Sequence, residues 1–138
     1  MAMTCAGAMI FAGGCAHAEI LIACGETSGK SLLLGSSEGW ADDRITEGSI
    51  ILTQGENGNL DIMIKDSLGW ISAIGSGSQV QLVDAYEGYV TVLVNYVGGS
   101  KELYTFDFNR RMVFWSQHKF GVLFDKVQTF TGDCDPPP

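Results

Sequence analysis

Short runs of alternating apolar and polar residues recur about every ten positions along this chain, and most end in a Gly, Asn or Asp cluster. Alternation with a period of two is typical of half-buried β-strands, and turn residues between such runs indicate hairpins. From residue 49 onward the pattern predicts eight consecutive strands, over residues 49–54, 60–66, 70–74, 79–84, 89–97, 101–108, 111–118 and 122–131.

The chain before residue 49 is less regular. Residues 19–24 predict a strand, and residues 31–34 predict either another strand or an irregular entry segment. In the following segment, residues 35–48, the run from Trp40 to Ile45 predicts a single helical turn that closes one end of the fold.

The alternation also predicts which side chains point inward. Apolar residues occupy every second position of three predicted strands, namely Leu60, Ile62, Ile64, Val90, Val92, Val94, Tyr96, Tyr104, Phe106 and Phe108. Successive side chains of a strand point to opposite faces, so these residues share the interior. Their aromatic members favour an interior filled by the protein's own side chains.

Short turns between the predicted strands set their order. Asn57-Gly58 and Gly98-Gly99 suit tight hairpins because Gly adopts positive φ without steric cost. Strands linked in this way pair with their neighbours, and closure removes exposed edges. We therefore expect residues 19–138 to form a single all-β domain, an eight-stranded antiparallel up-and-down barrel of the lipocalin-like kind. A two-sheet β-sandwich is the alternative.

The first 18 residues predict a signal peptide. Ala16-His17-Ala18 is a small-x-small motif of the kind that leader peptidases cleave, although the segment has no Lys or Arg before its apolar stretch. That stretch is too short to span a bilayer. The prediction is a periplasmic or secreted protein that begins at Glu19 and has no membrane span.

Cleavage there leaves two cysteines, Cys24 and Cys134, which bracket nearly the whole domain. In an exported protein an even number of cysteines predicts a disulfide. The alternative is a lipid anchor on Cys24, because Leu21-Ile22-Ala23-Cys24 resembles the signal of bacterial lipoproteins. Glu19 and His17 argue against that alternative, since burying a charge in a membrane is expensive.

The chain carries a net charge of −8, and all of its charged residues follow the predicted signal peptide. An acidic surface repels phosphate backbones, which argues against nucleic-acid binding and leaves a basic protein as the partner to expect. Two places are candidates for that contact: the acidic segment with Trp40, Asp42 and Asp43, and the strand with Phe114, where apolar residues occupy both faces.

The sequence offers little for catalysis. The run from Gly25 to Ser31 is one residue too short for a phosphate-binding loop. His118 is the single histidine after the signal peptide, and one histidine without free cysteines is too small a ligand set for zinc. We therefore expect no cofactor or metal, and a non-enzymatic binding protein. The alternatives are a carrier of a small apolar ligand and a hydrolase whose carboxylates cannot be placed from sequence.

The chain resembles two groups of proteins. Tyr104-Thr105-Phe106, the run from Trp115 to Lys119 and the run from Thr129 to Cys134, together with Cys24, are similar to small secreted β-rich proteins of Gram-negative bacteria. That resemblance implies a compartment and a β fold, with no activity. In size and acidity the chain is also similar to periplasmic inhibitors of c-type lysozyme, whose Ser-Gly-x-x-Tyr loop would lie at Ser28-Gly29 or Ser76-Gly77. Neither run has the Tyr.

Overall fold

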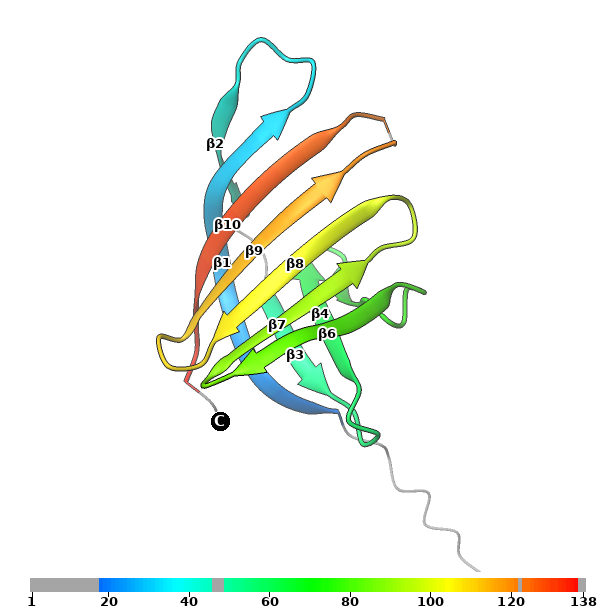
Figure 1. Cartoon of the computed structure of the whole chain (residues 1–138), viewed down its shortest axis with the longest axis vertical. Coiled ribbons are helices and arrows are strands. Elements are labelled where there is room, and N and C mark those ends of the chain that lie inside the picture. The colour runs from blue at the N-terminus through cyan, green and yellow to red at the C-terminus, as the bar shows by residue number, and fades with distance from the viewer. Residues whose placement is uncertain (1–17, 46–48, 122, 137–138) are drawn as a thin grey trace, which may run out of the picture.

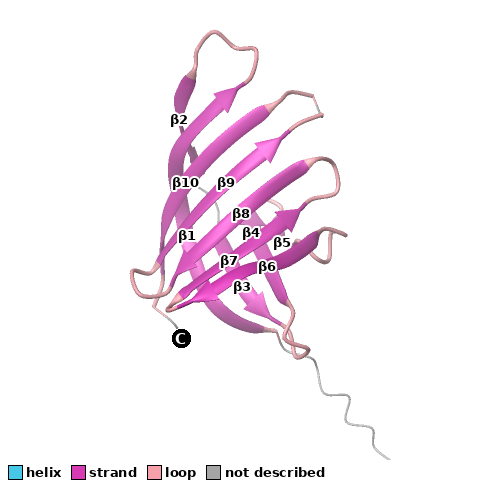
Figure 2. Cartoon of the chain, viewed as in Figure 1, coloured by secondary structure: helices cyan, strands magenta, loops and turns pink. Residues whose placement is uncertain are grey.

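The computed structural model describes residues 18–45, 49–121 and 123–136. All regular structure in these residues is β-strand, which confirms the all-β prediction (Figure 2). Ten strands follow one another along the chain: β1 (Glu19–Leu33), β2 (Trp40–Ile45), β3 (Ser49–Gln54), β4 (Leu60–Asp66), β5 (Gly69–Ser72), β6 (Gln79–Tyr86), β7 (Tyr89–Asn95), β8 (Ser100–Asp107), β9 (Met112–Lys119) and β10 (Lys126–Cys134).

The strands form one antiparallel sheet in the order β5-β4-β3-β1-β10-β9-β8-β7-β6, with β2 paired to β1 off this path. Figure 1 shows the sheet curling so that β3 and β4 lie behind β7 and β8. The long strand β1 joins two meanders, because its first half pairs with β3 while most of its length pairs with β10. The result is an open half-barrel with one concave and one convex face.

The predicted closed barrel is therefore wrong, because β5 and β6 at the two ends of the sheet do not pair. The alternative of a two-sheet sandwich is also wrong, because all of the strands belong to a single sheet. The segment predicted as a strand over residues 70–74 stops pairing at Ser72. There the Ser72 carbonyl accepts the backbone N–H of Ser76 at 3.0 Å, and the Ser72 hydroxyl accepts that of Gly75 at 2.8 Å. This turn leaves β5 only four residues long, and β5 stays at one edge of the sheet.

The helical turn predicted around Trp40 is also wrong. Residues 40–45 form β2, which pairs with β1 from Thr27 to Leu32. The link between the two strands reverses at Gly35 and Gly39, whose φ values of 87° and 68° favour glycine. The two segments predicted at 19–24 and 31–34 are parts of the one strand β1, which bends at two irregularities of its register.

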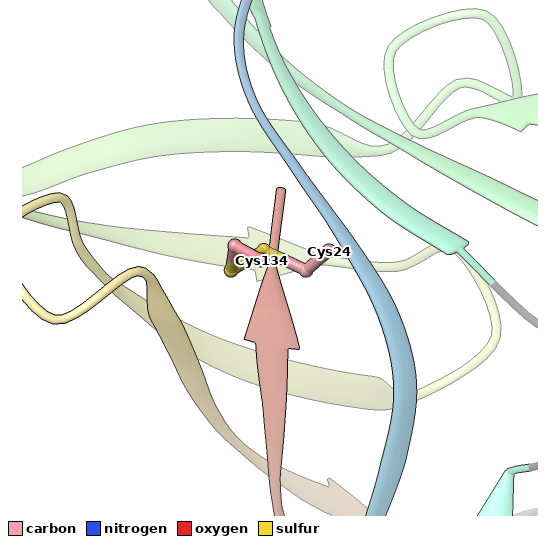
Figure 3. The surroundings of a disulfide bond; sticks show 2 residues. All are labelled: Cys24 and Cys134. Carbon is pink, nitrogen blue, oxygen red and sulfur yellow. A yellow bond between two sulfur atoms is a disulfide. The ribbon is translucent and has the colours of Figure 1, made fainter. Parts of the chain in front are cut away.

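A disulfide joins Cys24 of β1 to Cys134 of β10, as the sequence predicted (Figure 3). The cysteines lie directly opposite each other in the ladder. Farther along this pair of strands, a Cβ at Gly29 would lie 1.8 Å from the Thr129 carbonyl oxygen. Only glycine fits there, because β1 crosses β10 too closely for any side chain.

The core occupies the concave face, and the predicted inward residues Ile62, Val92, Val94, Tyr104 and Phe106 are all fully buried in it. They pack with residues from β1, β3, β9 and β10, namely Ile22, Ile50, Leu52, Val113, Trp115, Phe130 and the disulfide. Residues 1–17 of the predicted signal peptide lie outside the described residues. No helix in the described part of the chain is long and apolar enough to cross a membrane.

Candidate polar cavity on the concave face

Cross-strand register arranges the concave face in rows, because residues opposite each other in a ladder point to the same side. The central row is aromatic and runs through Val92, Tyr104, Trp115, Phe130 and Gly29. The next row lies two residues farther along each strand. It begins at Val94 and is then polar, through Glu102, Gln117, Gln128 and Ser31. The concave face therefore changes from apolar to polar over about 7 Å.

The aromatic row is tightly packed. Trp115 stacks on Phe130 with 4.6 Å between the ring centroids, and Tyr104 stacks on Trp115 at 5.7 Å. These rings fill this part of the interior, in line with the sequence expectation for the aromatic residues.

Glu102 is the centre of the polar row, and its exposed fraction is only 6%. One carboxylate oxygen accepts a hydrogen bond from the Tyr104 hydroxyl, and the other accepts one from the Gln117 side-chain amide. Burial raises the pKa of Glu102, and these hydrogen bonds oppose part of that rise. Burial and the nearby Glu102 charge also raise the pKa of Tyr104.

Two cavities adjoin Glu102, and both Glu102 and Gln117 line each of them. The first has a volume of about 270 Å³ and is also lined by Thr27, Tyr104, Trp115 and Gln128. The second has a volume of about 460 Å³, and its lining includes Tyr96, Ser100 and Lys119. The first volume lies just below, and the second within, the ~300–1,000 Å³ range of small-molecule sites.

Residues with unpartnered polar atoms gather at these cavities in the part of the chain that the structure describes. In the described part of the chain, five buried side-chain atoms have no hydrogen-bond partner: Thr27 Oγ1, Tyr96 OH, Ser100 Oγ, Trp115 Nε1 and Gln128 Oε1. All five belong to residues that line one of the two cavities. Because each unsatisfied buried polar group costs about 1–3 kcal/mol, their clustering needs a physical reason.

Charged groups around the cavities leave Glu102 without an ion pair. The three ion pairs among the described residues are Lys30–Asp42, Arg110–Asp107 and Lys126–Asp43. Lys65 and Lys119 line the cavities, but their ammonium groups lie over the rings of Trp70 and Phe124, at 5.7 and 5.0 Å from the centroids.

The residues predicted from sequence as partner contacts lie elsewhere. Trp40, Asp42 and Asp43 are in β2, and Phe114 is on the convex face of β9, separated from β2 by β10 and β1. Trp40 and Phe114 are 55% and 39% exposed. Asp42 pairs with Lys30 at 2.5 Å on the convex face. Four strands side by side span about 14 Å, so Phe114 does not contact the β2 residues.

Asp43 points to the opposite face from Asp42 and lies 3.3 Å from the Lys126 ammonium group. Partial burial alone would raise its pKa, but the Lys126 charge and hydrogen bonds bring the pKa below its usual value. His118 is exposed, and its ring lies edge-on to Phe120.

The sequence interpretation missed the polar row, although a signal for it was present. Tyr104 was placed inward by alternation, and two residues back along the same strand is Glu102. The same step leads from Trp115 to Gln117, and from Phe130 to Gln128. Polar residues at inward positions of this kind mark sites where a buried group needs a partner.

In the described residues, no group of three or more His, Cys, Asp or Glu side chains is placed to hold a metal ion. Comparison of the chain with protein-family models, with curated proteins and with solved structures finds no match. The function is therefore argued from the geometry of the site.

Proposed function

We propose that the protein is a non-enzymatic binding protein of the periplasm or the extracellular space, and that it takes a small polar molecule into the concave face beside Glu102. The observation that carries the proposal is that the five residues with unpartnered buried polar atoms, among those the structure describes, all line two adjoining cavities. A ligand with its own donors and acceptors would satisfy them once the side chains that carry them turn toward the cavities, and would recover the free energy that their burial costs.

This proposal differs from the carrier of an apolar ligand expected as an alternative. An apolar guest would leave Trp115 Nε1 and Gln128 Oε1 unpartnered and would add no stabilising contact to Glu102. The aromatic row already fills the apolar part of the interior, so the free volume lies on the polar side.

The test is native mass spectrometry of the gently purified full chain, followed by two-dimensional NMR of the side-chain amide and indole N–H groups. We expect a co-purifying polar molecule of low mass whose removal shifts the signals of Trp115 Nε1–H, Gln117 and Gln128. Recovery of a lipid, or a ligand whose removal leaves these three signals unchanged, would contradict the proposal.

A second candidate function is contact with a basic protein through the convex face. A groove with a volume of about 770 Å³ lies over β3, β4 and β5, and its apolar lining includes Ile20, Ile51, Met63, Trp70 and Ile74. Three of these side chains are substantially exposed, namely Ile20, Trp70 and Ile74. Together with the net charge of −8, the groove favours a partner with an apolar patch inside a basic surface.

Titration with c-type lysozyme, used as a basic probe protein, tests this candidate. Binding that weakens as salt rises and is lost in Trp70→Ser would support it. Binding that Trp70→Ser leaves unchanged would exclude the groove and direct attention to Trp40, Asp42, Asp43 and Phe114.

A further inference from the structure

We infer that the molecule bound beside Glu102 carries a positive charge, and that it is a small organic ammonium ion with a hydroxyl group. This inference rests on the proposed function and names the chemical class of the ligand.

Glu102 has no counter-charge among the described residues. Glu102 is buried and held by two neutral donors, Tyr104 OH and Gln117 Nε2, and no cation of the described residues forms an ion pair with it. Burying a carboxylate without a cation is costly, and a ligand cation would remove that cost. A neutral ligand would leave the charge uncompensated, and an anionic ligand would be repelled.

The charged residues that face the site from neighbouring strands also favour a cationic ligand. Asp66 of β4 lines the first cavity with Lys65, and Lys119 of β9 lines the second. The carboxylate of Asp66 accepts the backbone N–H of Leu68 at 2.8 Å. Lys126 is paired with Asp43. The cations are thus engaged with aromatic rings or another carboxylate, while Glu102 is free to pair with a ligand.

Hydrogen-bond acceptors around the cavities also favour a cation. Among the described residues, the buried acceptors Gln128 Oε1, Thr27 Oγ1 and Ser100 Oγ have no hydrogen-bond partner. An ammonium group brings three N–H donors for such acceptors.

One unpartnered group requires an acceptor from the ligand. Trp115 Nε1 is a donor only, so the ligand must also carry an oxygen. The first cavity has room for about nine water molecules at ~30 Å³ each, which suits a molecule of a few heavy atoms and excludes a long acyl chain. A short amino alcohol meets all of these requirements.

The experiment compares three probes of similar size that differ at one end: 4-aminobutan-1-ol, butane-1,4-diol and 4-hydroxybutanoate. Their binding to the full chain is followed by NMR at the Trp115 indole and the Gln117 and Gln128 amides. We expect the amine to bind at least about tenfold more tightly than the diol, and the carboxylate not to bind, at neutral pH.

Variants assign the effect to Glu102. Glu102→Gln should reduce the affinity for the amine to that for the diol, whereas Glu26→Gln, the same change at an exposed carboxylate of β1, should leave both affinities unchanged. Lys119→Gln should strengthen amine binding severalfold, because it removes a positive charge in the lining of the second cavity that repels the ammonium group. Amine affinity of the unmodified protein should fall as acid protonates Glu102.

The possible failures are distinct. A diol that binds as tightly as the amine, with shifts at Trp115 and Gln128, would overturn the charge inference and leave the proposed function standing. Amine binding that Glu102→Gln does not weaken would overturn the assignment of Glu102. If none of the three probes shifts any of these signals, both the inference and the proposed function lose their support.

Discussion

Strand β8 carries a buried carboxylate near each of its ends, and the two have opposite surroundings. Asp107 accepts the backbone N–H groups of Asn109 and Arg110 at 3.0 and 2.9 Å and pairs with the Arg110 guanidinium at 2.9 Å. Glu102 accepts two side-chain hydrogen bonds and forms no ion pair with a cation of the described residues. Hydrogen bonds and the Arg110 charge lower the pKa of Asp107, whereas burial raises the pKa of Glu102.

This difference separates a structural carboxylate from a candidate functional one. Asp107 fixes the turn between β8 and β9 with groups of its own hairpin, so its charge is satisfied as soon as the hairpin forms. Glu102 is part of a row that also contains the unpartnered Gln128, and that row faces free volume. Proteins tolerate such unsatisfied groups at sites where binding requires them.

The largest expected effect comes from placing a charge in the apolar part of the concave face. Val92 is 0% exposed and packs in the core, so Val92→Asp should abolish folding. The neighbouring Thr91 points to the convex face, where its hydroxyl hydrogen-bonds that of Thr105 at 2.9 Å. Thr91→Asp should therefore fold. Similar melting temperatures for the two variants would show that the faces of β7 are reversed.

The next effect concerns the disulfide that anchors the apolar end. Cys24 and Cys134 close a loop of 110 residues, and replacing both by Ser should lower the free energy of unfolding by about 2–5 kcal/mol. Urea denaturation with and without reducing agent measures this. Two free thiols in the native protein, or a stability that reduction leaves unchanged, would contradict the pairing.

A smaller effect, of the opposite sign, is expected at the polar end. Gln128→Met removes the unpartnered Oε1 and keeps the volume of the side chain, so it should raise the free energy of unfolding by about 1 kcal/mol and weaken ligand binding. Gln117→Met is the matched comparison, because Gln117 donates a hydrogen bond to Glu102 and its loss should destabilise the protein. Destabilisation by both changes would indicate that Gln128 has a structural partner.

The parts of this fold that depend on local pattern could be predicted from sequence. Eight strands follow residue 48, as alternation and turn residues indicated, and Val92 and Tyr104 point inward. The opening of the barrel could not be predicted, because alternation within strands does not show whether the edge strands β5 and β6 pair with each other. Nor could the placement of β1 between β3 and β10, which joins segments far apart in the chain.

The site was only partly accessible to the same reasoning. Alternation places three polar residues inward, each two positions from an inward aromatic residue: Glu102, Gln117 and Gln128. It gives no indication that Gln128 lacks a hydrogen-bond partner. That property depends on which atoms of β1, β8, β9 and β10 meet in three dimensions. The candidate contacts at Trp40, Asp42, Asp43 and Phe114 stay predictions, since they rest on exposure and charge.

The most direct test of the difference between the two carboxylates is thermal unfolding of Glu102→Gln and Asp107→Asn, measured side by side from acid to neutral pH. The folded-state pKa of Glu102 lies above its ordinary value of 4.5, so its contribution to stability falls as pH rises from about 4.5 through that raised pKa. The folded-state pKa of Asp107 lies below 3.8, so its contribution is present above that pH and is lost in acid.

At neutral pH and without ligand, we predict that Glu102→Gln raises the free energy of unfolding by about 1 kcal/mol, which corresponds to a rise in melting temperature of roughly 4 °C. This gain should disappear below about pH 4.5. Asp107→Asn should lower the melting temperature at the same pH. A Glu102→Gln protein that melts below the unmodified protein at neutral pH would contradict the account, because Glu102 would then be a structural carboxylate like Asp107.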